Sequence, residues 1–548
     1  MKAGASPAAG VRRSGSAWLL AITFAAGACT LVVELAAVRL LAPWFGASSG
    51  VWTNVIGVIL LALALGYLAG ARLAARSRPE RAFALVLLFS GLFSAWLPTL
   101  AGPVCGLFLP AGLSLHQAAG LWLWGSLAAA LLLFLPPAAL LGCVGPLAVE
   151  LLQVRRGLHA GTAGGHVLCA STLGSLLGTF ATTHLLLPFA GLTHSFLGAG
   201  AVLGLCGAAA WLLARPAAPG PGAAGLALLG TLAALAGSRL DRPALPDGMT
   251  LLASAESPYQ SLRVVEDTTL GAPLRLLQVN EGLDSFQSVW SPEPGLLGQG
   301  FYYDYFALPA WLAGGEGTWR TLVLGLGAGT AFRVLEGALP AGLKLEAWGV
   351  ELDRRIIELG RRWFDLPSGR ADRVVFSGQD ARLALRRMPD DFDLIVLDAY
   401  SNQVEIPAHL STLEFFQQAR AHLAPGGWLA VNVGGFGPDD PVVVALTSTV
   451  ACAFGESLAV RIPRARNWML YARRDAPLPP PDATGAARGP AWEVAGELAG
   501  ELLAPLELPG SVVRRSCTDA ALTDDRNPME VLQRRSLEEG RERLSSAR

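Results

Sequence analysis

Long apolar runs fill the first 238 residues of this 548-residue chain and constrain its fold more than any other feature. A membrane-spanning helix needs about 20 consecutive apolar residues. One run is overlong and contains Pro136-Pro137, so it forms either one kinked helix or two short ones. The last run is short and rich in Gly and Ala. We predict about seven spans, near residues 18–41, 51–74, 82–101, 121–152, 164–189, 192–214 and 222–237.

Charge separates this apolar part from the rest of the chain. Residues 1–238 contain eleven basic and three acidic residues, whereas the remainder contains 31 basic and 40 acidic residues. The overall net charge of −1 gives no reason to expect a nucleic-acid partner. Only 16% of the residues are charged, against about 25% in soluble proteins. The composition therefore predicts an integral membrane protein.

The arginines predict the orientation of the spans. Arg12 and Arg13, the loop 72–81 and the pair Arg155-Arg156 alternate with loops almost free of basic residues. Basic loops stay on the cytoplasmic side, so we expect a cytoplasmic N-terminus. Seven crossings put the C-terminal part outside, and six or eight keep it in the cytoplasm. Lys occurs only at positions 2 and 344, which is typical of a GC-rich genome, and we expect a bacterial inner membrane.

Few residues in the apolar part carry obvious chemistry. Glu34 and Arg39 lie in one span, and a charged group inside a bilayer costs about 2.5–3.5 kcal/mol. Glu34 is therefore either a functional group or the partner of Arg39 or of another helix. The seven cysteines include no CxxC pair and no Cys/His cluster with zinc spacing. We accordingly expect neither a metal site nor a disulfide framework.

After Arg239 the apolar runs shorten to the length of strands. Short strands at 262–266 and 274–279, followed by a turn at 280–284, predict a small β-region. Strands and helices then alternate, which predicts a Rossmann-like, doubly wound parallel sheet of the AdoMet-methyltransferase type. The expected strands are 321–326, 345–350, 373–376, 392–397 and 428–433, and the expected helices are 331–335, 354–364, 381–387 and 412–423. The expected domains are a tail (1–16), the membrane domain (17–238), the β-region (239–315), the Rossmann-like domain (316–475) and an extension with a Pro-rich linker (476–548).

Three successive strand ends carry the residues of a nucleoside site. A glycine loop, Gly325–Gly329, follows the first strand, Glu351 ends the second, and Gln379-Asp380 ends the third. Ligands of such sheets bind at the carboxyl ends of the strands, where an acid can bind ribose hydroxyls. A second acid can accept a hydrogen bond from an adenine amino group. A glycine loop followed by two acids is more typical of S-adenosylmethionine (AdoMet) sites than of NAD sites, which need only the first acid.

Six motifs in a consistent order resemble the spermidine synthase family of polyamine aminopropyltransferases. They are SPYQSLRV (257–264), LQVNEGLDSFQS (277–288), LVLGLGAGT (322–330), WGVELD (348–353), SGQDAR (377–382) and DLIVLDAY (393–400). The apolar half resembles the membrane-embedded branch, often labelled fused transporter-like/spermidine synthase proteins. IPAHLSTLEFF (406–416) and LTDDRNP (522–528) also resemble that branch.

The resemblance implies a role for each matching residue. Asp398 corresponds to the carboxylate that accepts a proton from the attacking amine. Decarboxylated AdoMet, or AdoMet itself, is the implied cosubstrate, with no metal. The implied cosubstrate residues are Gln260, Gln287, Gly325, Gly327, Gly329, Glu351 and Asp380, and the implied acceptor residues are Tyr302, Tyr303 and Tyr400.

Two departures from the family pattern concern the acceptor. Ala328 and Ser401 stand where soluble members of the family have acids that bind a cationic polyamine. The first hypothesis is therefore aminopropyl transfer from decarboxylated AdoMet to a small-molecule amine by a membrane-anchored enzyme, with a second copy of the chain as a candidate partner. Methyl transfer from AdoMet to another acceptor is the second. A transporter of polyamines or other small molecules with a regulatory nucleoside-binding domain is the third.

Overall fold

The computed structural model resolves the chain into two compact units, each described here by itself. The first comprises residues 1–113, 120–244 and 256–260, and the second comprises residues 114–119, 245–255 and 261–548. Described in detail are residues 17–45, 49–76, 78–108, 115–214, 247–257, 259–269, 272–279, 286–298, 301–400, 406–478, 510–518 and 521–546, with a few residues of 225–245 and 502–506.

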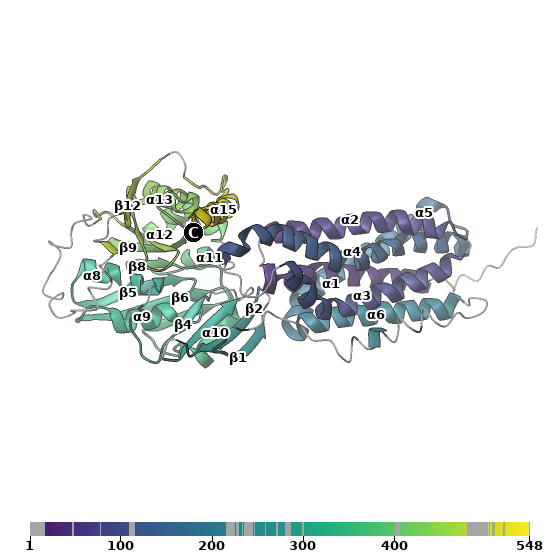
Figure 1. Ribbon diagram of the computed structural model, residues 1–548, viewed down its shortest axis with the longest axis horizontal. Coiled ribbons are helices and arrows are strands. Elements are labelled where there is room, and N and C mark those ends of the chain that lie inside the picture. The colour runs from purple at the N-terminus through teal and green to yellow at the C-terminus, as the bar shows by residue number, and fades with distance from the viewer. Residues whose placement is uncertain are drawn as a thin grey trace, which may run out of the picture. The chain divides into compact units, whose positions relative to one another are not determined.

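The first unit is a bundle of long helices that run side by side (Figure 1). Helix α3 packs along α6, and α1 packs along α5. The run with Pro136-Pro137 forms one continuous helix, α4. The elements are α1 (Ala17–Phe45), α2 (Ser49–Ala74), α3 (Pro79–Phe108), α4 (Leu115–Arg156), α5 (Ala160–Ala181), the π-helix η1 (Thr182–Ala190) and α6 (Gly191–Ala214).

Within the described residues, five helices are long and apolar enough to cross a membrane: α1, α2, α3, α4 and α6. The expected span at 164–189 is occupied by α5 and η1, which are rich in Gly, Ser, Thr and His. Most of the expected span at 222–237, and the tail 1–16, lie outside the described residues. The expected number of seven spans and the side of the second unit stay predictions.

Glycines bring the helix backbones of this unit close together. A Cβ atom on Gly174 of α5 would collide with the carbonyl group of Phe24 on α1. A Cβ atom on Gly178 would collide with the carbonyl group of Ala28, one turn further along the same two helices. Small residues at such contacts are typical of helices that pack inside a bilayer.

The second unit contains a small antiparallel sheet in the order β1-β2-β3-β4. Strand β2 pairs antiparallel with β3, and β3 pairs antiparallel with β4. The strands are β1 (Met249–Glu256), β2 (Ser261–Asp267), β3 (Leu274–Val279) and β4 (Ser288–Trp290). The expected turn at 280–284 lies outside the described residues.

An eight-stranded sheet forms the body of the second unit, in the order β12-β10-β11-β9-β8-β5-β6-β7. Strands β9, β8, β5, β6 and β7 are parallel to one another, whereas the pairs β9–β11, β11–β10 and β10–β12 are antiparallel. The strands are β5 (Gly317–Leu324), β6 (Leu343–Glu351), β7 (Arg373–Ser377), β8 (Phe392–Leu397), β9 (Leu423–Gly434), β10 (Glu456–Arg461), β11 (Asn467–Arg473) and β12 (Val512–Ser516). The α/β fold class is confirmed, and the antiparallel edge is an addition that we did not predict.

Helices follow the strands as the alternating pattern predicts. The short helices η2 (Tyr302–Phe306) and α8 (Leu308–Ala313) precede β5. Between and after the parallel strands lie α9 (Thr330–Ala338), α10 (Arg354–Trp363), α11 (Ala381–Leu385), η3 (Ala408–Leu410), α12 (Leu413–His422) and α13 (Pro441–Phe454), and α15 (Met529–Ser546) ends the unit.

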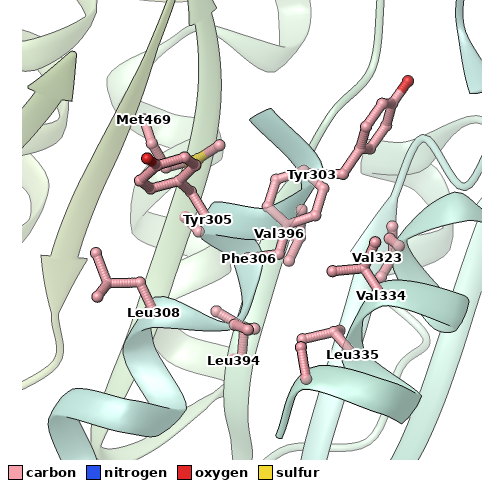
Figure 2. Packing of buried hydrophobic residues seen from close by; sticks show 14 of the residues in the cluster. Tyr303, Tyr305, Phe306, Leu308, Val323, Val334, Leu335, Leu394, Val396 and Met469 are labelled. Carbon is pink, nitrogen blue, oxygen red and sulfur yellow. The ribbon is translucent and has the colours of Figure 1, made fainter. Parts of the chain in front are cut away.

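The central strands are buried on both faces. Val323 of β5 and Val396 of β8 belong to one core cluster, which also contains residues of η2 (Figure 2). Their neighbours Leu324 and Leu397 belong to a second cluster. Because successive side chains of a strand point to opposite faces, the two clusters lie on the two faces of the sheet. Burial on both faces explains why these strands are continuous apolar runs.

One disulfide joins the edge of the sheet to a neighbouring helix. Cys452 of α13 is bonded to Cys517, which follows β12. The absence of close Cys pairs led us to expect no disulfide framework, and this single bond was not anticipated. The two residues are 65 positions apart and become neighbours only when β12 pairs with β10 beside α13.

Candidate active site

A tight glycine loop follows β5 at the centre of the parallel sheet. Gly325 has φ +89°, and a Cβ atom there would collide with the backbone of Asp398 and Ala399 at the end of β8. Only a residue without a side chain allows this close approach at a positive φ. The loop then enters α9 at Gly329, which has φ +105°. The two strand ends are therefore held against each other.

Strand β4 of the small sheet supports the glycine loop. The Ser288 hydroxyl accepts a hydrogen bond from the Ala328 N–H at 2.8 Å and donates to the Gln287 carbonyl at 2.6 Å. The Thr330 hydroxyl bonds both the N–H and the carbonyl of Val289, at 2.8 and 2.9 Å. The Gln287 side-chain nitrogen is buried without a hydrogen-bond partner, so this amide has donors to offer a ligand.

Glu351 ends β6 next to this loop. One of its carboxylate oxygens accepts from the Gly327 N–H and the other from the Asp353 N–H, each at 2.9 Å. Burial raises the pKa of Glu351 to about 7, although these two hydrogen bonds act in the opposite direction. Each oxygen keeps a second acceptor position, so the side chain can still bind ribose hydroxyls.

Asp380 follows β7 and caps the N-terminus of α11. It accepts hydrogen bonds from the Leu383 N–H at 3.0 Å and pairs with His409 Nε2 at 2.8 Å. Burial raises the pKa of Asp380, but the hydrogen bonds from Leu383 and His409 outweigh burial and leave the pKa below its ordinary value. Asp380 is therefore a carboxylate at neutral pH and can accept a hydrogen bond from an amino group.

Asp398 directly follows β8 and is held by two neutral donors. The Asn432 amide of β9 donates to Asp398 Oδ1 at 2.8 Å, and the Tyr302 hydroxyl donates to Oδ2 at 3.1 Å. The Asn467 amide of β11 donates to Asn432 Oδ1 at 2.7 Å, which orients the Asn432 amide. Burial raises the pKa of Asp398 to about 7, and the charge of Glu351 adds to the rise. This pKa suits a group that takes up a proton near neutral pH.

Aromatic side chains surround Asp398. The ring of Tyr303 stacks on that of Tyr302 with the centroids 4.0 Å apart, and Tyr303 lies in the core cluster beside Phe306 (Figure 2). The Tyr400 hydroxyl donates to the Asn432 carbonyl at 2.8 Å and accepts from the Gly434 N–H at 3.2 Å. These residues place apolar surface and hydroxyl groups around one carboxylate.

The structure brings most of the expected site residues together at the carboxyl ends of β5, β6, β7 and β8. The Gly327 N–H of the glycine loop donates to Glu351, and Gly325 of the same loop lies against the backbone of Asp398. The Tyr302 hydroxyl donates to the Asp398 carboxylate. Gln260 belongs to the segment 256–260 that groups with the first unit, whereas the site described here consists of second-unit residues. Ser401 lies outside the described residues.

Three residues of this region were not identified from the sequence. Asn432 lies in β9, which overlaps the expected strand 428–433, Asn467 lies in β11, which was not predicted, and His409 lies in the short helix η3. Asn432 is a polar residue in the apolar run of β9, which is the one local signal that marks it. In the described part of the chain, no group of three or more His, Cys, Asp or Glu residues is placed to hold a metal ion.

Comparison with known proteins gives the following matches. The chain is 35% identical over 192 residues to a probable polyamine aminopropyl transferase of Bifidobacterium longum, covering 34% of this chain and 40% of that relative. It is 30% identical over 440 residues to polyamine aminopropyltransferase 2 of Streptomyces coelicolor, covering 76% of this chain and 73% of that relative. A crystal structure of a probable spermidine synthase from Corynebacterium glutamicum matches with a TM-score of 0.38 and 20% identity, covering 48% of this chain and 90% of that one. No family model matches.

The first unit consists of long apolar helices, and the second contains a Rossmann-like sheet with a glycine loop after β5. The match to the Streptomyces protein extends over most of both chains. The chain belongs to the polyamine aminopropyltransferase family. It spans less than half the length of the Bifidobacterium relative.

Proposed function

We propose that this protein is a membrane-anchored aminopropyltransferase that uses decarboxylated AdoMet, with Asp398 as the proton acceptor. One observation carries the proposal. Asp398 lies against the glycine loop and is bonded to two neutral donors, Asn432 and Tyr302. Burial raises the pKa of this carboxylate to about 7, although the two hydrogen bonds act in the opposite direction, so Asp398 can take a proton from an amine near neutral pH.

The proposed reaction is an in-line displacement. The amine nitrogen attacks the methylene carbon beside the sulfonium of decarboxylated AdoMet, a carbon–nitrogen bond forms, and the carbon–sulfur bond breaks. The sulfur keeps the electron pair and leaves as methylthioadenosine. The amine gives its extra proton to Asp398, because a free base at this position keeps the attacking nitrogen uncharged and oriented.

The other residues bind and orient the reactants in this proposal. Glu351 bonds the ribose hydroxyls, Asp380 bonds the adenine amino group, and Gly325, Gly327 and Gly329 let the backbone approach the nucleoside. Gln287 offers its unpartnered amide to the same ligand. Tyr302, Tyr303 and Tyr400 bound the acceptor side of Asp398.

The five long apolar helices support anchoring in a membrane. We propose an integral protein of a bacterial inner membrane with a cytoplasmic N-terminus. AdoMet-type cosubstrates are cytosolic, so the proposal also requires the second unit to face the cytoplasm. Protease accessibility in inverted vesicles tests this requirement, since a protected second unit contradicts it.

Methyl transfer from AdoMet is a second candidate, and one observation favours it. Ala328 of the glycine loop is fully buried and bonded through its N–H to Ser288, so this position contributes no acid to a polyamine site. An acceptor that is not a polyamine suits such a site better.

One experiment separates the two reactions. The purified full-length protein is incubated with AdoMet or decarboxylated AdoMet and a panel of amines, and the products are read by mass spectrometry. Methylthioadenosine together with a product heavier by an aminopropyl group supports the proposal. S-adenosylhomocysteine supports methyl transfer, and the absence of both products contradicts both.

A further inference from the structure

The segment that precedes the last helix is fixed to the helices beside the predicted adenine site. We call residues 522–528 the C-terminal strap. The side chain of Leu522 is buried in the core, with 3% of its surface exposed. Its N–H donates to the Thr449 hydroxyl of α13 at 3.0 Å, and its carbonyl accepts from the Leu413 N–H of α12 at 2.7 Å. The strap is thus anchored at its first residue between two helices.

The strap continues with an ion pair to the first turn of α11. The two terminal nitrogens of the Arg382 guanidinium, Nη1 and Nη2, donate to the Asp524 carboxylate at 2.6 and 2.7 Å. The Arg382 side chain is 12% exposed and that of Asp524 is 45% exposed. Paired, charge-assisted hydrogen bonds with one buried partner are stronger than ordinary surface ion pairs. Arg382 lies two residues after Asp380, so this pair holds the turn that carries the predicted adenine acid.

The strap also holds the short helix η3. The Asn527 amide donates to the Ala408 carbonyl at 2.7 Å and to the Ser411 hydroxyl at 2.9 Å. Arg382 donates to the carbonyl of His409, which lies between those two residues, at 3.1 Å. Arg382 therefore holds the backbone of His409 itself, and the strap holds its neighbours Ala408 and Ser411.

His409 connects this arrangement to the site. Its Nε2 lies 2.8 Å from Asp380 Oδ2. The strap reaches Asp380 along two routes, one through Asp524 and Arg382 and the other through Asn527 and η3. Each route combines hydrogen bonds with one or two residues of backbone: Asp524 bonds Arg382, two residues after Asp380, and Asn527 bonds Ala408, next to His409.

We propose that the C-terminal strap is a part of the cosubstrate site, because it fixes η3 and the first turn of α11 so that His409 contacts Asp380. This inference rests on the proposed function, in which Asp380 binds the adenine. Asp524, Arg382 and Asn527 are positioning residues, and none of them is expected to touch the reacting atoms. Loosening the strap should weaken the binding of the nucleoside and leave the chemical step unaffected.

The test measures binding of methylthioadenosine to the full-length protein by calorimetry, together with steady-state kinetics. Asp524→Ala is expected to weaken binding by about threefold to tenfold, because a charge-assisted pair is lost. The cosubstrate KM should rise by a similar factor, and kcat at saturation should stay within about twofold. Asp524→Glu keeps the carboxylate and should recover most of the affinity. Glu539→Ala is the matched control, since it breaks an exposed 2.7 Å pair with Arg535 on α15 and should leave affinity unchanged.

The outcomes separate this inference from the proposed function. If the wild-type protein does not bind methylthioadenosine, the proposed function fails, and this inference fails with it. If the wild type binds and Asp380→Ala weakens binding while Asp524→Ala does not, only the inference is overturned. A lower melting temperature of Asp524→Ala with unchanged affinity also overturns it, since the strap then has a merely structural role.

Discussion

The two units of this chain differ in the exposure of their large apolar side chains. In the helical unit many of them are exposed: the side chains of Leu60, Leu68 and Leu205 are 56%, 58% and 67% exposed. In the α/β unit they face inward, and Leu324 and Trp428 are at most 1% exposed. Outward apolar surface is unfavourable in water and neutral in lipid, so these exposed side chains support the proposed membrane anchoring of the first unit.

The two units also place their glycines in different structural roles. In the helical unit, Gly174 and Gly178 lie at helix contacts, where a side chain would push two backbones apart. In the α/β unit, Gly325 and Gly329 have positive φ and shape the loop of the site. Glycine allows close packing of helices in the first unit and a loop with positive φ in the second.

The largest expected effect tests whether the chemistry belongs to the strand-end acids of the α/β unit. Asp398→Asn should lower kcat by about 10²-fold to 10⁴-fold, because the proton acceptor is lost while hydrogen bonding is kept. Calorimetry should show nearly unchanged binding of methylthioadenosine. Asp393→Asn, on the same strand and bonded to the Arg320 N–H, is the control and should retain activity. Turnover by Asp398→Asn at the wild-type rate excludes the proposed role.

The next effect tests close packing in the helical unit. Gly174→Leu should destabilise the protein by about 3 kcal/mol or more, because α1 and α5 must separate. Gly165→Leu is the matched control on the same helix, where a Cβ atom meets nothing within 4 Å. Melting temperature and monodispersity in detergent measure both variants. Equal effects from the two substitutions contradict the packing described here.

The dependence of kcat on pH tests the proposed role of Asp398 in the α/β unit. Asp398 must be ionised to accept a proton, and burial raises its pKa to about 7. With both substrates saturating, kcat should fall about tenfold per pH unit below pH ~7 and level off above it. A rate independent of pH between about 5.5 and 7.5 is inconsistent with Asp398 as the base.

The smallest effect concerns stability. Burial raises the folded-state pKa of both Glu351 and Asp398 to about 7, so the folded protein holds more protons than the unfolded chain between pH ~4 and ~7. These groups increase the free energy of unfolding at the acidic end of this range, and the increase disappears as pH rises through ~7. The melting temperature should therefore decline less with rising pH in Asp398→Asn than in the wild type. An identical decline in the two proteins contradicts this contribution.

Much of the fold follows from local sequence patterns. Strands β5, β6, β7 and β8 were predicted within a few residues, because parallel strands buried on both faces are short apolar runs with clear ends. The antiparallel strands β10, β11 and β12 were not predicted. Their place in the sheet depends on pairing with β9 and with each other, and local patterns do not encode pairing partners.

The residues of the candidate site also divide into those expected from local sequence and those that were not. Glu351, Asp380 and Asp398 were expected, because each directly follows or ends a predicted strand. Asn432 and His409 were not, although each bonds one of these acids. Both are ordinary polar residues in sequence, and each reaches its acid from a different element.

The sequence by itself determined an apolar helical half, an α/β half and a row of acids at strand ends, because hydrophobic periodicity and strand ends are local properties. Only the tertiary structure decided which donors bond Asp398, that Cys452 pairs with Cys517, and that residues 522–528 bond the first turn of α11, which follows Asp380. Those contacts join residues 34 to 142 positions apart, and the pairing of distant segments is a property of the packed core.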